Sequence, residues 1–457
     1  MLKNYLDVAL RSFLGNKLFS FINVFGLAVG LASAILIGLY VANELSYDRF
    51  QPDADRLYRI SRDFHPVNGS EEMYLATNAA PAAALLQTDF PEIELTARVF
   101  GGRVLLTRSD DVSFYDDNVR FADPAVLRMF AFDWLAGDPA AALNEPNSIV
   151  LTESMARKLF GGADPLGERL EMENSIGLNV TGVVRDLPAN THLSASVLIS
   201  LETIFQMFGD QSRVAWTTNA YHTYVKLAPG ADIGTINAGL PAFLTRHVSE
   251  NASEWTGMTA MPVTDIHLHS TRQFEMKPPG SMAAVLSLTT VAFGILVIAC
   301  FNFMNLSTAR SALRGKEVGV RKTIGAERKH LVLQFLGESI GLTLLATFVA
   351  VVIVEIVLPA FNGFLGRTLA FDVLRDAQLQ LALLALVVVV GTLAGLYPAL
   401  YLSGFKPARV LKNRNAADLG DVLFRNLLVV LQFSISIVLV IATAVVMLQT
   451  RYAREFD

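Results

Sequence analysis

The sequence predicts a multi-span α-helical membrane protein with a large mixed α+β extracytoplasmic domain inserted between its first and second transmembrane helices. Three observations predict this fold. The 457-residue chain is 52% hydrophobic and has a mean hydropathy of +0.42, which is too apolar for an ordinary soluble protein. Five apolar runs are long enough to cross about 30 Å of hydrocarbon as helices. A long stretch of mixed character separates the first run from the other four.

The first apolar run follows a short amphipathic segment. In residues 1–18, apolar side chains share one helical face and charged ones the other, which predicts a cytoplasmic interfacial helix. The apolar face holds Leu2, Leu6, Leu10, Phe13 and Leu14, and the charged face holds Lys3, Asp7 and Arg11. Residues 19–43 form the first span. The triplet Ala32-Ser33-Ala34 is typical of a signal-peptide cleavage site, but the apolar run continues past it, so we interpret this span as an uncleaved anchor.

Four more spans are predicted at residues 281–309, 331–358, 377–405 and 427–450. Lysine and arginine are concentrated in the intervening segments 310–330 and 406–426, whereas the loop at 359–376 is nearly balanced in charge. The positive-inside rule therefore places the amino terminus and both basic segments in the cytoplasm. Residues 44–280, the loop 359–376 and the tail 451–457 then lie outside.

The outside segment, residues 44–280, is long enough for one or two folded units. Strand-like patterns such as "RLYRISRDF", "RVLLTRS", "NSIVLT" and "NVTGVVRDL" alternate with the short helical patterns "DPAVLRMFAF" and "TESMARKLFGG". The second helix is predicted to begin with a Thr152 cap and to end at Gly161. We therefore expect a mixed α+β domain.

Several chemistries find little support in the sequence. The net charge of −5 argues against nucleic acid as a partner, and the single cysteine, Cys300, excludes a disulfide within one chain and a thiolate zinc site. "GGADPLG" lacks the Lys-Ser/Thr ending of a phosphate-binding loop and is interpreted as a turn. "DIHLHS" would put His267 and His269 on one face of a strand, but no acidic or cysteine partner at useful spacing supports a metal site. We predict no metal site and no catalytic residue.

The order of segments and several motifs resemble one known family. "NKLFSFINVFGLAVGLASAILI...ELSYDRF", the stretch from "FADPAVLRMF" to "NVTGVVRDLPANTHL", and "ARSALRGKEVGVRKTIGAERKHLVLQFLGES" are similar to FtsX/MacB-type permeases of ABC transporters. The resemblance covers essentially the whole chain, and the last motif is the most specific. It implies a MacB-like periplasmic core domain at 44–280 and an FtsX-like permease domain in the bacterial inner membrane.

The resemblance also implies a mechanism and partners. Such permeases have no ATPase motif and hold no cofactor, since ATP is bound by a separate cytoplasmic ABC ATPase. A cytoplasmic coupling helix docks on that subunit, and the periplasmic domain moves in response (mechanotransmission). Substrates in the family include drugs, peptides and lipoproteins, and some members regulate cell-wall hydrolases. Besides the ATPase and the lipid bilayer, the expected partners are a second permease half or a second copy, and a periplasmic adaptor.

The motif match assigns ATPase coupling to a short part of the segment 310–330. Its residues are Lys316, Glu317, Val318, Gly319, Val320, Arg321, Lys322, Ile324, Gly325 and Ala326. Gly319 and Gly325 would allow a close backbone approach, and Val320 and Ile324, four apart, would share an apolar face. Arg321 and Arg328 could pair with acidic groups of the ATPase. The alternative is that these charges only fix the topology.

Polar or flexible positions inside the spans also need an interpretation. Glu338 lies within the third span, where it either belongs to a proton-coupled site or, as we prefer, pairs near the cytoplasmic interface. Gly391, Gly395 and Pro398 in the fourth span are interpreted as sites of close helix packing and bending.

Three broader hypotheses remain. The fifth span loosely repeats the layout of the first, so we expect this chain to be the first half of a duplicated permease. A transmembrane receptor or regulator that senses a periplasmic ligand is the alternative function, although no cytoplasmic output domain is evident. A secondary transporter is disfavoured because broken helices and inverted repeats are not evident.

Overall fold

The computed structural model describes residues 17–65, 71–108, 112–404 and 419–455. The chain divides into a helical unit, residues 1–42 with 283–457, and a mixed α/β unit, Asn43–Met282. Nearly all of the predicted interfacial helix at 1–18, and most of the basic loop at 406–426, lie outside the described residues.

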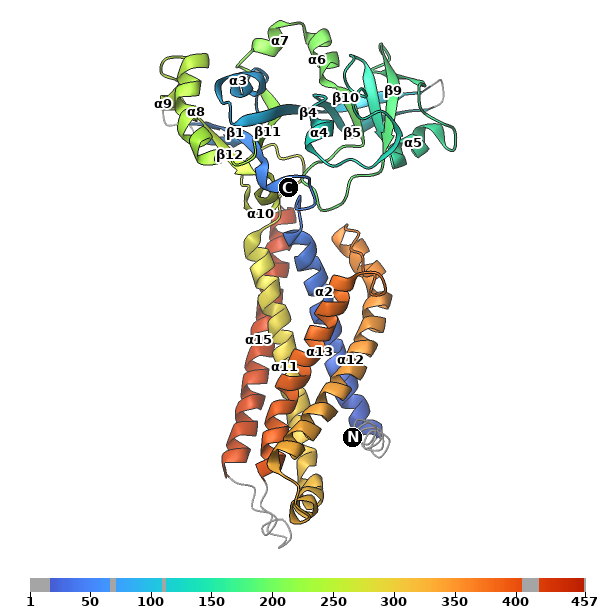
Figure 1. Cartoon of the computed structure of the whole chain (residues 1–457), viewed down its shortest axis with the longest axis vertical. Coiled ribbons are helices and arrows are strands. Elements are labelled where there is room, and N and C mark those ends of the chain that lie inside the picture. Colours follow the sequence, from blue (N-terminus) through green and yellow to red (C-terminus); the bar gives the residue numbers. More distant parts are fainter. Residues whose placement is uncertain (1–16, 66–70, 109–111, 405–418, 456–457) are drawn as a thin grey trace. The chain divides into compact units, whose positions relative to one another are not determined.

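Five helices in the described residues are long and apolar enough to cross a membrane. They are α2 (Lys17–Leu45), α11 (Met282–Thr323), α12 (Arg328–Leu365), α13 (Ala377–Gly404) and α15 (Leu419–Glu455) (Figure 1). The whole mixed unit lies between α2 and α11 in the sequence. The predicted fold class is therefore confirmed.

Small residues let α12 and α13 pack closely. A Cβ atom added to Gly391 would lie 2.9 Å from Cα of Ile340, and one added to Gly395 would lie 2.6 Å from Cβ of Ser339. Any larger side chain at these positions would separate the two helices, because both contacts involve atoms that cannot easily move. The interpretation of Gly391 and Gly395 as packing positions is confirmed.

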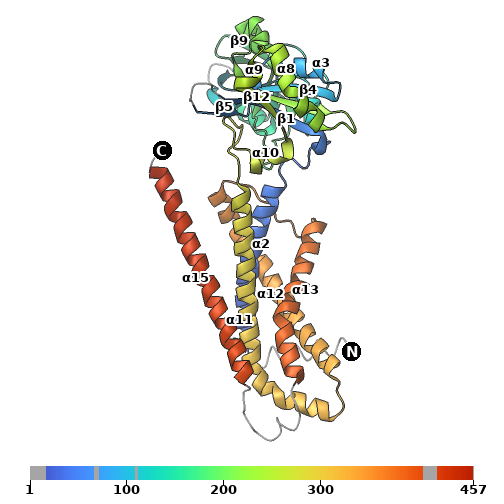
Figure 2. The same cartoon turned by 90° about the vertical axis from the view of Figure 1, so that its left-hand side faces the viewer.

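Two helices extend beyond their predicted spans. α11 continues from the second span into the basic segment without an end near residue 309, and Figure 2 shows its last part turned away from the axis of its first part. α12 continues through Pro359 to Leu365, so the external loop begins later than the predicted residue 359. The helix ends where Gly366 adopts φ +61° and its N–H donates to the Asn362 carbonyl, a left-handed termination that favours glycine.

The mixed unit is built on one sheet, with twelve strands in the described residues. The main path is β12-β1-β11-β4-β5-β10-β7-β9-β6, with β2 beside β1, β3 beside β11, and β8 beside β4 and β9. Only β5/β10 and β7/β9 pair in parallel among these strands. The strands are β1 (Leu57–Phe64), β2 (Met73–Leu75), β3 (Asn78–Ala79), β4 (Ile93–Thr107), β5 (Ser113–Ala122), β6 (Trp134–Gly137), β7 (Ser148–Thr152), β8 (Arg169–Met172), β9 (Ile176–Val184), β10 (Val197–Ser200), β11 (Asn219–Leu227) and β12 (Thr256–Pro262).

Short helices cover the sheet. They are η1 (Ala54–Arg56), α3 (Ala82–Asp89), α4 (Val126–Met129), α5 (Glu153–Phe160), α6 (Leu201–Phe208), α7 (Gln211–Val214), α8 (Ile233–His247), α9 (Ala252–Trp255) and α10 (Val263–His269). The central strand β7 is buried on both faces: Ile149 and Leu151 pack in the cluster that includes α5 and α6, and Val150 packs in the opposite cluster. This two-sided burial explains the continuous apolar run in "NSIVLT".

Two local predictions in this unit are corrected. "DIHLHS" forms the helix α10, not a strand, so His267 and His269 do not lie on one face of a strand as predicted. The hydroxyl of Thr152 does not cap α5 but donates to the Ser196 carbonyl at 2.9 Å. Asp186 takes over the capping role, because its carboxylate accepts from the Ser154 N–H at 3.1 Å. The end of α5 at Gly161 is as predicted, with φ +62°.

One face of the sheet buries charged and titratable groups. Arg59 on β1 makes a two-point ion pair with Glu275, at 2.5 Å and 2.8 Å, and its side chain is fully buried. His222 on β11 donates from Nε2 to the Phe274 carbonyl at 2.9 Å. Burial lowers the pKa of His222 to about 3, and the positive charge of Arg59 contributes to this shift. His222 is therefore neutral in the folded protein at ordinary pH.

The buried His222 predicts an acid-dependent loss of stability. An unfolded histidine binds its proton near pH 6.5, whereas folded His222 does so only near pH 3. The unfolded chain therefore binds more protons in this window, and stability falls as pH falls, by up to ~1.4 kcal/mol per pH unit for this group. Thermal unfolding between pH 7.5 and 4.5 should show a shallower pH dependence for His222→Gln than for the wild type. Equal slopes in the two proteins would contradict this assignment.

Candidate functional site

The basic segment singled out in the sequence forms three pieces of structure. It consists of the end of α11, a turn at residues 324–327 and the first turn of α12. The backbone of Lys316 and Glu317 lies in α11, but their side chains lie outside the part of the chain that is described. The other predicted coupling residues can be placed individually.

A glycine turn ends α11. Gly325 has φ +100°, the Gly325 N–H donates to the Lys322 carbonyl at 3.1 Å, and the Ala326 N–H donates to the Arg321 carbonyl at 3.0 Å. These two bonds and the left-handed glycine make a Schellman motif. Gly325 is thus required by the turn, and a Cβ atom at this position would have nothing within 4 Å. The role of Gly325 in this turn is to let the chain reverse direction, and this role does not depend on a partner protein.

The inner side of the segment packs on its own chain. Val318 and Gly319 are buried, and Val318 belongs to an apolar cluster that holds Leu331 and Phe335 of α12 and Ala399 and Leu402 of α13. The close approach of Gly319 to the ATPase stays a prediction. The cluster fixes the end of α11 against α12 and α13.

Two cationic side chains hold the end of α13. Lys322 Nζ donates to the Ser403 carbonyl at 2.6 Å, and Arg328 Nε donates to the Ser403 hydroxyl at 3.3 Å. The last carbonyls of a helix have no partner within the helix and carry partial negative charge, so cations are favoured there. This pair of contacts joins both sides of the turn to α13.

A second polar chain joins α11 to α12. Arg321 Nη1 donates to Gln334 Oε1 at 2.6 Å, and Gln334 Nε2 donates to Glu338 Oε1 at 3.1 Å. Glu338 is half-buried and lies four residues after Gln334 on the same helical face. This geometry supports the interpretation of Glu338 as a carboxylate bonded near the end of its span.

The outer side of the segment is apolar and exposed. Val320 is 48% exposed and Ile324 is 81% exposed. Because the two residues are four apart, they form one ridge at the end of α11. An exposed apolar ridge surrounded by fixed polar contacts has no catalytic chemistry, but it suits docking into a groove of another protein.

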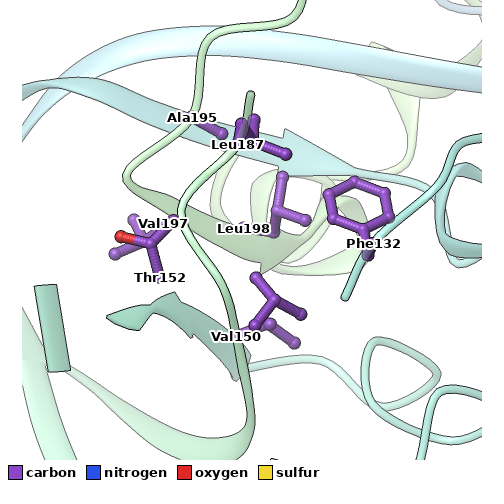
Figure 3. Close-up of a pocket in the computed structure, with 8 residues that line it drawn as sticks. Phe132, Val150, Thr152, Leu187, Ala195, Val197 and Leu198 are labelled. Atoms are coloured by element: carbon purple, nitrogen blue, oxygen red, sulfur yellow. The ribbon is translucent and has the colours of Figure 1, made fainter. Parts of the chain in front are cut away.

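The mixed unit has a small apolar pocket, which we do not take as a docking or catalytic site. It is lined by side chains of β7, β9, β10 and neighbouring loops, including Phe132, Val150 and Leu198 (Figure 3). Thr152 supplies a hydroxyl there, but it is bonded to the Ser196 carbonyl. In the described ranges, no three His, Cys, Asp or Glu side chains converge as metal ligands.

The structure adds residues that the sequence motif did not reveal. Ser403, Gln334 and Leu402 hold the segment in place. Ser403 and Leu402 lie on α13, beyond the motif, and Gln334 lies within the motif but was not assigned a role. Only the spacing of Gln334 and Glu338, four apart on one helix, was a usable signal in the sequence.

Comparison with known families agrees with this geometry. Residues 20–243 match the MacB-like periplasmic core domain, and residues 289–407 match the FtsX-like permease C-terminal domain. The chain is a MacB/FtsX-type ABC permease. It is a multi-pass membrane protein whose mixed unit is the periplasmic domain. The first match covers this domain and the second covers the permease domain.

Named relatives of the permease include transport proteins of bacteria. The macrolide export ATP-binding/permease protein MacB of Chlorobium luteolum is 24% identical over 430 residues, which are 89% of this chain and 60% of the relative. MacB of Neisseria gonorrhoeae is 22% identical over 366 residues, which are 78% of this chain and 53% of the relative. The permease thus spans about 60% of the length of the first of these relatives.

Solved structures also resemble the periplasmic domain. The periplasmic region of MacB from Actinobacillus actinomycetemcomitans aligns with a TM-score of 0.35 at 14% identity, over 47% of this chain and 91% of that chain. A permease domain from Porphyromonas gingivalis aligns with a TM-score of 0.43 at 24% identity, over 52% of this chain and 99% of that chain.

The contacts of Glu338 predict the effect of two substitutions. Glu338→Gln keeps an oxygen that can accept from Gln334, so hydrogen exchange of residues 318–326 should stay closer to the wild type than in Glu338→Leu. Glu338→Leu removes the acceptor and should speed that exchange by about 10-fold or more, since a hydrogen bond to a charged group contributes roughly 1.5–3 kcal/mol. Measurement by hydrogen–deuterium exchange decides between the two interpretations. If Glu338→Gln abolished transport with unchanged exchange, a proton-carrying role would replace the structural one.

Proposed function

We propose that this permease couples ATP hydrolysis by a cytoplasmic ABC ATPase to motion of its periplasmic domain, for export of a substrate such as a drug, peptide or lipoprotein. The Val320–Ile324 ridge docks on the ATPase, and the residues around it hold the ridge in place. The observation that carries this proposal is the exposed ridge at the end of a helix that continues from a membrane span. The printed name of the MacB relatives, which joins ATP binding and a permease, supports it.

The charge distribution supports the side on which docking occurs. The segments 310–330 and 406–426 are rich in lysine and arginine, and such loops face the cytoplasm in bacterial inner-membrane proteins. We accordingly place the amino terminus and the ridge in the cytoplasm of a bacterium. In this proposal the positive charges of Arg321 and Arg328 complement acidic groups of the ATPase.

The same proposal includes a second permease half. α15 is apolar and carries many exposed large side chains, including Phe433, Ile437 and Ile441. α15 contacts α11, because a Cβ atom added to Gly294 of α11 would lie 3.5 Å from the Ile435 side chain of α15. In this proposal α15 is the first span of a second half or faces a second copy of the chain, and a periplasmic adaptor completes the exporter.

The ridge makes a direct test possible. Ile324→Asp or Val320→Asp places a charge where an apolar side chain enters the groove. Each should lower the permease-dependent stimulation of the ATPase by at least about 10-fold, because residues at the centre of an interface commonly contribute 2 kcal/mol or more. The measurement is ATP turnover by the purified complex in lipid nanodiscs. Gly319 and Gly325 replaced by bulky residues should also uncouple the ATPase.

A matched control separates docking from general damage. Leu374 is 90% exposed in the loop between α12 and α13, so Leu374→Asp makes the same chemical change on the opposite side of the membrane. It should leave ATPase stimulation within about twofold of the wild type. Normal stimulation in Ile324→Asp and Val320→Asp would exclude the ridge as the docking site.

A further inference from the structure

Three motifs that play no part in docking lie together inside the periplasmic domain. They are "ELSYDRF" (Glu44–Phe50), "ANTHL" (Ala189–Leu193) and "DIHLHS" (Asp265–Ser270). The domain joins the membrane helices through two connections, residues 43–51, which include the end of α2, and residues 277–281 before α11. The three motifs meet at these two connections.

The first meeting point is a buried acid–imidazole pair. Nε2 of His267 on α10 lies 2.8 Å from Oε2 of Glu44, and both side chains are buried. The ring of Tyr47 stacks on the His267 imidazole with 3.4 Å between centroids. The His267 carbonyl accepts from the Gly280 N–H at 2.7 Å. His267 therefore binds the first connection with its side chain and the second with its backbone.

Gly280 shows how tightly the two connections are held there. A Cβ atom at this position would lie 2.7 Å from Oε2 of Glu44 and 2.8 Å from Nε2 of His267. Contacts this short do not occur for real Cβ atoms, so the closed Glu44–His267 pair admits only glycine at position 280.

The second meeting point leads into the sheet. Asp48 is fully buried, and its Oδ2 accepts from the His192 backbone N–H at 2.9 Å and lies 2.8 Å from His192 Nδ1. Nε2 of His192 lies 2.8 Å from the hydroxyl of Tyr224 on β11. An unbroken line of hydrogen bonds therefore runs from the first connection to β11, an interior strand of the sheet.

The "ANTHL" loop also binds the second connection. Lys277 Nζ donates to the Thr191 carbonyl at 2.7 Å. On the other side, Asn190 Nδ2 donates to the Ser46 hydroxyl at 2.9 Å, and the Asp48 N–H donates to the Asn190 carbonyl at 3.0 Å. Both connections are thus held twice, once by α10 and once by this loop.

We propose that this cluster, the neck clamp, is the joint through which motion of the membrane helices enters the periplasmic domain. Glu44, His267, Asp48 and His192 are its positioning residues. α11 makes the route direct, since one continuous helix carries Val320 near its end and begins two residues after Gly280. The inference rests on the proposed function, because it assumes that ATP turnover moves these helices.

The test measures ATP-dependent motion in the intact complex. Hydrogen–deuterium exchange of β11 and β1 is compared with and without ATP in the full-length permease with its ATPase in nanodiscs. His267→Phe keeps a ring to stack on Tyr47 but loses the bond to Glu44, and it is combined with His192→Phe. The ATP-dependent change in exchange should fall at least fivefold, while ATP turnover stays within twofold. His267→Gln in place of His267→Phe supplies an amide N–H donor and should restore at least half of the change at this point.

Two further variants keep the test decisive. His247→Phe breaks an acid–imidazole pair of similar length, His247 Nε2 to Asp89 Oδ2 at 2.9 Å, away from both connections, and should leave the ATP-dependent change intact. Lys277→Met removes the half-buried bond from Lys277 to the Thr191 carbonyl. It should reduce the ATP-dependent change in exchange, and it tests the proposal if the double variant does not fold.

The outcomes separate the two proposals. An ATP-dependent change that is as large in the folded double variant, or in Lys277→Met, as in the wild type would overturn the neck clamp alone. A wild-type complex that hydrolyses ATP with no change in the periplasmic domain would overturn the proposed function and the clamp with it.

Discussion

The cost of placing charge in hydrocarbon is the constraint on which the arrangement of this permease depends. A lysine or arginine at the centre of a span costs about 2.5–3.5 kcal/mol, so the basic residues at the end of α11 and after α13 must lie at the membrane surface. α11 is apolar up to Thr308 and then becomes basic without interruption. The helix continues past its apolar stretch, its last part is turned away from the axis of its first part (Figure 2), and its end exposes Val320 and Ile324. The proposed docking and coupling depend on this extension.

Different chemistry serves the two ends of α11. Near the docking ridge, Lys322 and Arg328 hold Ser403 at the end of α13, and an apolar cluster around Val318 supports them. Near its start, buried carboxylate–imidazole pairs hold the first connection of the periplasmic domain, and the contacts of Gly280 and Lys277 hold the second. Both arrangements contain hydrogen bonds shielded from solvent. Loss of one partner leaves a polar group unsatisfied, which costs free energy.

The sequence predicted what depends on local pattern and little of what depends on contacts between distant segments. Hydrophobic run length and loop charge gave the spans, and strand-like apolar patterns gave β1 and β7. Two helix limits differed: α11 continues past residue 309, and α12 continues through Pro359 to a glycine termination at Gly366. "DIHLHS" was assigned to a strand, in which side chains two residues apart share a face, but it forms a helix. Ser403 and the partner of His267 could not be found, since each lies far away in sequence.

The most direct measurement is the membrane side of the ridge. Cys300 is the only cysteine of the chain and is buried, so Ile324→Cys in a Cys300→Ser background offers a single reactive thiol. A membrane-impermeant maleimide should leave it unlabelled in spheroplasts and label it in inside-out vesicles, and Leu374→Cys should show the reverse. Labelling of Ile324→Cys in intact spheroplasts would place the ridge outside the cytoplasm. No cytoplasmic ATPase could then reach it, and the account of coupling would be wrong.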